Sequence, residues 1–159
     1  MNITLEEAKE SDAAAVFNMQ IIAFRPLLEK YQDYDTNPGN EKLERVLQRI
    51  HNPRGRFLKI LIDEVLAGAI NIVEKEKHCY WISPLFILPE FQGKGIAQKA
   101  MILAEELVPQ AKSWNLSTIL EEEGNCYLYR KLGYRQIGEP KKLNEKTTLV
   151  YFEKTAQKH

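Results

Sequence analysis

Three apolar segments joined by short polar connections occupy much of the middle of the chain. They cover residues 57–62, 65–73 and 78–88. Their β-branched and aromatic side chains favour strands. The first connection has only two residues, Asp63 and Glu64, a length typical of a hairpin. Residues 74–77 form the second turn. The pattern therefore predicts an antiparallel block of three strands.

Helical periodicity appears on both sides of this block. Ser11 and Asp12 are candidate caps for a first helix, whose apolar face is Ala14, Phe17, Ile21, Phe24 and Leu28. A second helix is predicted by the shared face of Leu43, Val46, Leu47 and Ile50, and a third by that of Ile96, Ala100, Leu103, Ala104 and Leu107. A short fourth helix is predicted over residues 126–132, with Gly133 as a left-handed cap. Strands are predicted at 116–120, 134–137 and 147–152. This order predicts an α+β fold around a mixed sheet.

Size and charge limit the range of functions. A chain of 159 residues is predicted to form a single domain over residues 1–159. Its 22 basic and 22 acidic residues balance, which disfavours nucleic acid or an anionic membrane as a partner. The two cysteines, Cys79 and Cys126, form neither a disulfide framework nor a metal motif. No apolar run approaches the roughly 20 residues of a membrane span, so we expect a soluble, unprocessed, cytoplasmic protein without a metal.

The turn between the third strand and the following helix has the features of an anion site. A helix N-terminus leaves backbone N–H groups unpaired, and Gly93 and Gly95 allow a ligand to approach them closely. Lys94 adds positive charge and Ala97 leaves space. A dinucleotide fingerprint would need glycine where Gln98 stands, and the order of Lys94 and Gly95 does not match a P-loop. The turn is predicted to bind pyrophosphate, although two glycines alone are equally explained by a tight turn.

Two motifs carry a family resemblance. Gln92, Gly95 and Ala97, after the lead Pro89-Glu90-Phe91, resemble the signature of the GNAT N-acetyltransferases, and residues 125–134 resemble a second element of that family. The resemblance covers about residues 80–138. It implies a GNAT-like, mixed, mostly antiparallel central sheet with helices on both faces and with the fourth and fifth strands splayed apart.

The resemblance also implies acetyl-CoA as acyl donor. The matching cofactor-binding residues are Leu85, Phe86, Ile87, Gln92, Gly93, Lys94, Gly95, Ile96, Ala97, Asn125 and Tyr129. The first three would lie along the pantetheine arm, with a backbone N–H near Ile87 facing the thioester carbonyl. Pro84 favours a bulge or an unpaired edge beside them, since proline cannot donate to a ladder. Asn125 also stands where a helix needs an N-cap, and both roles are open.

Tyr129 matches the family's general acid, which protonates the departing thiolate. The base is less defined. Glu121 is the leading candidate among three consecutive glutamates expected to end a strand, where alternation places Glu121 and Glu123 on one face and Glu122 on the other. A solvated acidic strand end is the alternative. His78 is a further candidate.

The resemblance also implies that the stretch between the first two helices lines the acceptor side, here the loop expected over residues 31–37. Its side chains Tyr31, Asp33, Tyr34 and Asp35 would suit a polyamine, a lysine or an aminoglycoside, although a polar surface loop explains them as well. We therefore expect transfer of acetyl to a primary amine of a small molecule or peptide, by direct attack in a ternary complex. The alternative is a noncatalytic acyl-CoA-binding sensor. Exposed apolar strands near the C-terminus favour a homodimer.

Overall fold

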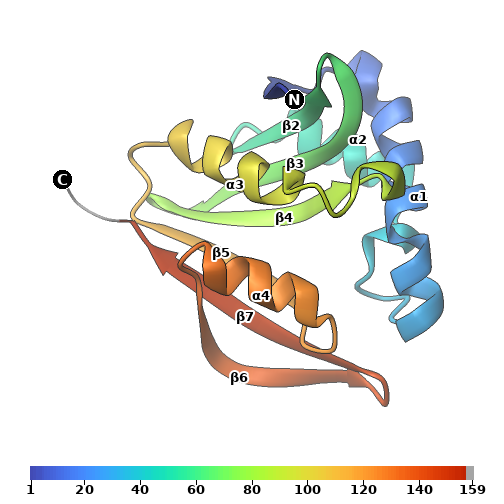
Figure 1. Cartoon of the computed structure of the whole chain (residues 1–159), viewed down its shortest axis with the longest axis vertical. Coiled ribbons are helices and arrows are strands. Elements are labelled where there is room, and N and C mark those ends of the chain that lie inside the picture. The colour runs from blue at the N-terminus through green and yellow to red at the C-terminus, as the bar shows by residue number, and fades with distance from the viewer. Residues whose placement is uncertain (157–159) are drawn as a thin grey trace.

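Seven strands form one sheet in the order β1-β2-β3-β4-β5-β7-β6 in the computed structural model, which describes residues 1–156 (Figure 1). The strands are β1 (Ile3–Glu7), β2 (Gly55–Ile62), β3 (Val65–Glu76), β4 (Cys79–Ile87), β5 (Ser113–Ile119), β6 (Arg135–Asn144) and β7 (Thr147–Thr155). All neighbours are antiparallel except β4 and β5, which are parallel. The predicted mixed, mostly antiparallel α+β fold is confirmed.

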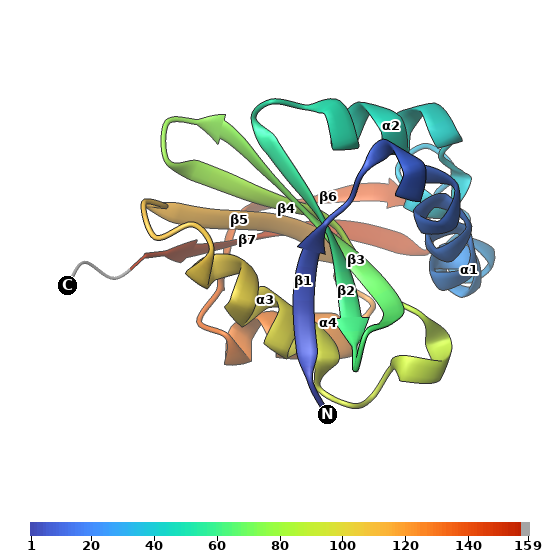
Figure 2. The same cartoon turned by 90° about the horizontal axis from the view of Figure 1, so that it is seen from above.

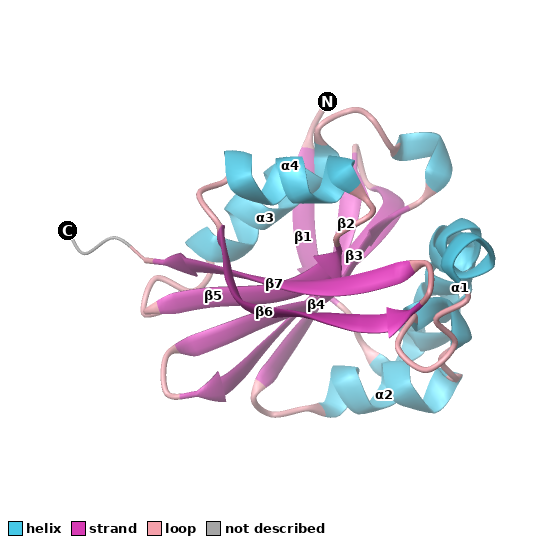
Figure 3. Cartoon of the chain, turned by 90° about the horizontal axis from the view of Figure 1, so that it is seen from below, coloured by secondary structure: helices cyan, strands magenta, loops and turns pink. Residues whose placement is uncertain are grey.

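The four α-helices cover both faces of the sheet (Figures 2 and 3). They are α1 (Ala13–Tyr31), α2 (Leu43–His51), α3 (Ile96–Glu106) and α4 (Glu123–Lys131). The helices α1 and α2 pack on one face around Val16, Val46 and Phe57, while α3 and α4 pack on the other, where the larger apolar core lies. Among residues 1–156, no helix is long and apolar enough to cross a membrane.

The connections follow the predicted turn chemistry, with some shifts in boundaries. Asp63 and Glu64 both have positive φ, 48° and 70°, which matches the twist of a two-residue hairpin. Gly133 has φ 96° after α4, as predicted for a left-handed cap. The strand β3 runs three residues further than expected, so its turn narrows to Lys77 and His78. The strand β1, which pairs with β2, had not been predicted as a strand.

The predicted inner face of α1 was wrong by about one position. The buried residues are Ala13, Val16, Met19, Gln20, Ala23 and Tyr31, whereas Ala14 is exposed. Phe24, in the predicted face, is only half-buried, because its ring packs against Phe86 at the edge of the core and also lines the cavity described below. A cavity-facing apolar residue and a core-facing one carry the same helical periodicity, so the pattern does not separate them.

The parallel ladder between β4 and β5 is short. It consists of the pairs Cys79–Ser113, Tyr80–Trp114 and Trp81–Asn115, after which the strands diverge (Figure 1). The predicted splay of the fourth and fifth strands is confirmed. At the fork, Asn115 Nδ2 donates a hydrogen bond to the Tyr80 carbonyl at 3.3 Å.

Two features of β3 shape the diverging part of β4. The register between these strands shifts at Ser83 and Pro84, which confirms the predicted bulge, and Asn71 Nδ2 donates to the Ser83 carbonyl at 2.9 Å. Beyond the bulge, a Cβ built on Gly68 would lie 2.2 Å from the Phe86 carbonyl oxygen. Only glycine therefore permits this close approach of β3 and β4.

Candidate functional site

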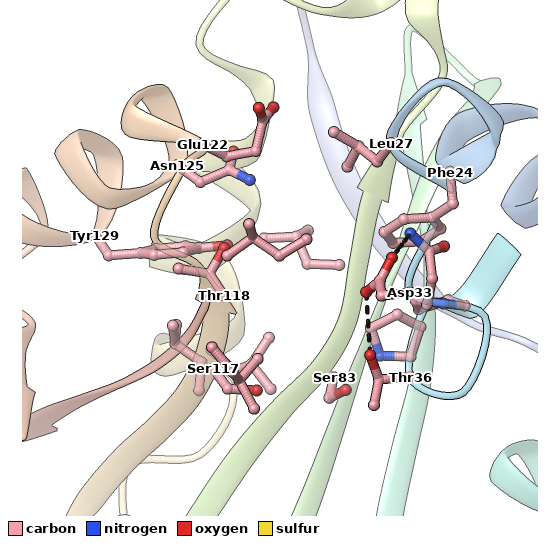
Figure 4. Close-up of a pocket in the computed structure, with 18 residues that line it drawn as sticks. Phe24, Leu27, Asp33, Thr36, Ser83, Ser117, Thr118, Glu122, Asn125 and Tyr129 are labelled. Atoms are coloured by element: carbon pink, nitrogen blue, oxygen red, sulfur yellow. Dashed lines mark hydrogen bonds between the residues drawn. The ribbon is translucent and has the colours of Figure 1, made fainter. Parts of the chain in front are cut away.

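A cavity of about 340 Å³ occupies the opening between β4 and β5 (Figure 4). One wall comes from α1 and its following loop, including Phe24, Leu27 and Asp33; the opposite wall comes from β5 and α4. The other lining residues are Thr36, Asn37, Pro38, Ile82, Ser83, Pro84, Leu85, Leu116, Ser117, Thr118, Ile119, Glu122, Asn125, Tyr129 and Leu149. The lining is mostly apolar with a few polar groups, as is usual for a small-molecule site.

The N-terminus of α3 presents unpaired amides. Gly93 and Gly95 have φ values of 76° and 77°, and Gly95 is the N-cap without a side-chain cap. Within residues 1–156, none of the N–H groups of residues 93–97 donates a hydrogen bond. A Cβ at either glycine would meet no atom within 4 Å. Free donors, open space and the positive helix end form a ready anion site.

The backbone of β4 links this turn to the cavity. The Leu88 N–H donates to the Ala67 carbonyl at 2.8 Å, so alternation turns the N–H groups of Leu85 and Ile87 away from β3 and toward the opening. Gln92 Nε2 donates to the Ile87 carbonyl at 2.9 Å and so ties the turn to the strand. Lys94 lies over the Phe91 ring at 5.9 Å.

Tyr129 is the tyrosine that reaches the cavity. It is 9% exposed, and its ring packs against Phe152 and Tyr134 at 5.9 and 6.2 Å. Burial, with a smaller contribution from Cys126, raises the pKa of Tyr129 to about 12. Among residues 1–156 its hydroxyl has no hydrogen-bond partner, and Figure 4 shows it beside Thr118 in the cavity.

Asn125 is not the N-cap of α4. Glu122 occupies that position and Asn125 lies inside the helix, since α4 begins three residues earlier than predicted. The Asn125 side chain lines the cavity beside Glu122 (Figure 4) and makes no hydrogen bond with any other residue in the described range 1–156. Of its two expected roles, only the contact with a ligand fits this placement.

The three glutamates do not end a strand, so that expectation was wrong. The strand β5 stops at Ile119 and the chain turns at once, which removes the alternation on which the choice of Glu121 rested. Glu121 lies outside the cavity, where its carboxylate accepts bonds from the Thr148 N–H and hydroxyl at 2.7 and 2.9 Å. Desolvation alone would raise its pKa, but these bonds leave the pKa lowered. Glu121 is therefore not placed to take a proton in the cavity.

The remaining acid and base candidates differ in whether they line the cavity. Glu122 lines the cavity, whereas Glu123 is the exposed first residue of α4. His78 lies in the β3–β4 turn and does not contribute to the cavity lining. Asp33 lines the cavity from the other wall, and its oxygens accept bonds from Thr36 Oγ1 at 3.0 Å and Asn37 Nδ2 at 3.3 Å.

Asp35, by contrast with Asp33, is exposed and outside the lining. The sequence pattern had not singled out Phe24, Leu27 or Thr118 for the cavity. Nothing local marks them, because the walls meet only through the tertiary fold.

Proteins of known structure share this architecture. Spermidine N-acetyltransferase from Vibrio cholerae, in complex with CoA and spermine, superposes with a TM-score of 0.76 at 18% identity, covering 96% of this chain and 95% of that one. PaiA N-acetyltransferase from Thermoplasma acidophilum, in complex with coenzyme A, gives 0.73 at 15% identity, covering 98% and 100%. At 15% and 18% sequence identity, this likeness shows a shared fold and nothing further.

Sequence comparison gives the family. Spermidine N(1)-acetyltransferase from Escherichia coli strain K12 is 31% identical over 96 residues, covering 58% of this chain and 52% of that protein. The chain thus spans about half the length of the curated relatives it matches. The acetyltransferase (GNAT) family model matches residues 23–134, well over half of the chain. This protein therefore belongs to the acetyltransferase (GNAT) family.

Proposed function

We propose that the chain is an N-acetyltransferase that moves acetyl from acetyl-CoA to a primary amine of a small molecule or peptide, by direct attack in a ternary complex. The observation that carries the proposal is the opening between β4 and β5. Unpaired amides lie at the start of α3, and a cavity with Tyr129 and two carboxylates lies between the diverging strands. The unpaired amides suit an anionic acyl donor, and the two carboxylates suit a cationic acceptor.

The residues around the opening fit acetyl-CoA. The N–H groups of Gly93, Lys94, Gly95, Ile96 and Ala97 are free to bind a diphosphate, and Leu85, Phe86 and Ile87 offer the edge of β4 to the pantetheine arm. Gln92 holds the turn against that edge, and Asn125 faces the cavity. When bound, acetyl-CoA supplies an acetyl group activated as a thioester.

The protein's own groups have defined tasks in this proposal. The Ile87 N–H faces the opening and stabilises negative charge on the carbonyl oxygen. As the neutral amine forms the C–N bond and the C–S bond breaks, Tyr129 gives its proton to the departing sulfur. The proton that the amine nitrogen loses passes to solvent, and Tyr129, whose pKa is raised to about 12, takes a proton back from solvent. Glu121, bonded to Thr148, has no part in these steps.

The acceptor we propose is an aliphatic amine, with a polyamine as the first candidate. Glu122 and Asp33 bring negative charge to a cavity whose other walls are largely apolar, which suits a cation on a hydrocarbon chain. The acetyltransferase relatives named for spermidine support the same class.

The test combines binding and turnover. Titration calorimetry with acetyl-CoA should show heat, and incubation with acetyl-CoA and a panel of amines should release free thiol and yield an acetylated product by mass spectrometry. Binding without thiol release across the panel would favour the noncatalytic sensor. No heat with any coenzyme A ester would refute the proposal.

A further inference from the structure

The two oxygens of the Glu122 carboxylate are used unequally. Tyr31 Oη donates to Oε2 at 2.5 Å, and Lys30 Nζ lies 3.3 Å from the same atom. Within residues 1–156, Oε1 accepts no hydrogen bond. The Glu122 side chain is 25% exposed and lines the cavity. One oxygen thus fixes the orientation of the carboxylate and leaves the other available.

Tyr31 is itself held in place from several sides. The expectation that it begins the loop was wrong, since it is the last residue of α1 and only 4% exposed. Its carbonyl accepts bonds from Asn144 Nδ2 at 2.8 Å and Thr147 Oγ1 at 3.2 Å, both in the β6–β7 hairpin. Burial, and then Glu122, raise the pKa of its hydroxyl, which remains a donor. The contacts of Tyr31 therefore join α1 to α4 and β7 across the opening.

The other acidic groups near the cavity are already engaged. Both Asp33 oxygens bond the donors of their own loop, and both Glu121 oxygens bond Thr148 outside the cavity. A carboxylate whose oxygens satisfy neighbouring donors serves the fold first. Glu122 is the acidic side chain of the lining that keeps an oxygen free.

We infer that Glu122 Oε1 binds the acceptor amine in its ammonium form, and that Tyr31 is a positioning residue that aims this oxygen into the cavity. The bound ammonium passes one proton to solvent before its nitrogen attacks the thioester. The inference rests on the proposed function and adds to it the residue that selects the acceptor. A charged hydrogen bond of this kind favours amines that carry their proton in solution, as alkylamines with a pKa of about 10 do. Neutral amines of similar shape gain nothing from it.

The decisive experiment compares two acceptors at pH 7: an alkylamine, which is charged, and a fluorinated alkylamine that is neutral. Glu122→Gln should raise KM for the charged amine at least tenfold, leave KM for the neutral amine within about threefold, and leave KM for acetyl-CoA unchanged. Tyr31→Phe should raise KM for the charged amine severalfold, because the carboxylate loses its fixed orientation. Glu122→Asp should restore part of the discrimination.

Matched controls lie close by. Glu123→Gln makes the same charge change one residue along, on an exposed side chain, and Tyr34→Phe removes the hydroxyl of a tyrosine that is 55% exposed. Both should keep the wild-type ratio of the two KM values. Other charged or titratable groups around the carboxylate, Lys30, Asp33, Glu121, Cys126 and Tyr129, stay intact in every variant.

A wild-type measurement removes any dependence on the folding of the variants. An alkylguanidinium, charged and a poor nucleophile, should inhibit against the amine at least tenfold more strongly than the neutral alkylurea of the same shape. Equal inhibition, or a Glu122→Gln variant that affects both amines alike, would overturn the role of Glu122. A wild-type protein that neither binds acetyl-CoA nor transfers acetyl would instead refute the proposed function.

Discussion

Three tyrosines around α4 differ in what their hydroxyl groups contact. Tyr127 is 68% exposed, and Tyr134 donates to Glu105 Oε2 at 3.3 Å on the side of α3. Tyr129 alone of these three reaches the cavity. Their residue type does not distinguish these tyrosines. Only the position of Tyr129 in the family motif over residues 125–134 indicated it as the general acid. At this scale, placement in the fold decides which phenol is available for chemistry.

Tyr129→Phe should therefore lower kcat by roughly a hundredfold, because general acid catalysis contributes about 10²–10⁴. KM for acetyl-CoA should change little, since the ring and its packing remain. Steady-state kinetics with Tyr127→Phe as control measure both constants. Unchanged turnover would remove Tyr129 from the mechanism.

The raised pKa of Tyr129 also predicts a pH dependence of stability. Burial favours the neutral phenol, so this contribution is complete below pH 10, the ordinary pKa, and is lost as pH rises toward about 12. Above pH 10 the free energy of unfolding of the wild type should fall about 1.4 kcal/mol per pH unit more steeply than that of Tyr129→Phe. Urea unfolding at pH 9 and pH 11 tests the difference; parallel slopes would contradict it.

At the scale of elements, the turn before α3 combines left-handed glycines with open space beside them. A side chain at Gly95 must adopt φ 77° yet meets no protein atom within 4 Å. Gly138 in β6 has φ 68° and equally open surroundings. The two glycines thus share a conformational cost and open surroundings, but only Gly95 lies among the unpaired amides at the start of α3.

Gly95→Ala and Gly138→Ala should each lose about 1 kcal/mol of stability, the cost of a left-handed residue other than glycine. Only Gly95→Ala should weaken acetyl-CoA binding, by roughly tenfold or more, because its methyl group occupies the space beside the free amides. Thermal unfolding and calorimetry of both variants give the comparison. Equal affinities would place the diphosphate elsewhere.

The sequence predicted most elements because their signals are local. Hairpin turns, the change of period at α3 and the proline bulge in β4 each depend on neighbouring residues. The acidic segment after β5 was misjudged, since the chain turns after Ile119 without glycine or proline to mark the point. Glu122 and Tyr31 lie 91 residues apart, and no local pattern indicates that they meet.

Gly68 is a position where a signal was present and not used. Glycine inside a strand often marks a close approach of backbones, and here it brings β3 within reach of Phe86. The sequence around such a glycine does not say which strand comes close to it. The pattern therefore predicts that two backbones approach, but it does not identify the second strand.

At the scale of the whole molecule, the sheet is divided into two parts. The strands β1 to β4 and β5 to β7 share three residue pairs and the Asn115 bond at one end of the opening. The contacts of Tyr31 join them at the other. Net charge is zero, so attraction of charged ligands depends on local groups at the opening. A homodimer stays a prediction; among the residues of the edge strand β6, Ile137 is 39% exposed.

Acetyl-CoA should stabilise this divided sheet. A ligand at a hundredfold its Kd adds about 2.7 kcal/mol to the free energy of unfolding. Differential scanning fluorimetry should show a rise in Tm with acetyl-CoA, and hydrogen exchange should slow along residues 82–87. Adenine alone, which lacks the diphosphate, is the control. A rise in Tm without slower exchange in β4 would place the ligand away from that strand.

The three-pair ladder at Cys79–Trp81 leaves the rest of that edge of β4 without a strand partner. The larger apolar core and the contacts of Tyr31 hold the two parts of the sheet together, so this edge stays open while the fold around it is fixed. In the proposed complex, the pantetheine arm pairs with this edge of β4 and extends the sheet by one strand. Release of the product would then break the backbone hydrogen bonds that the arm had made with β4.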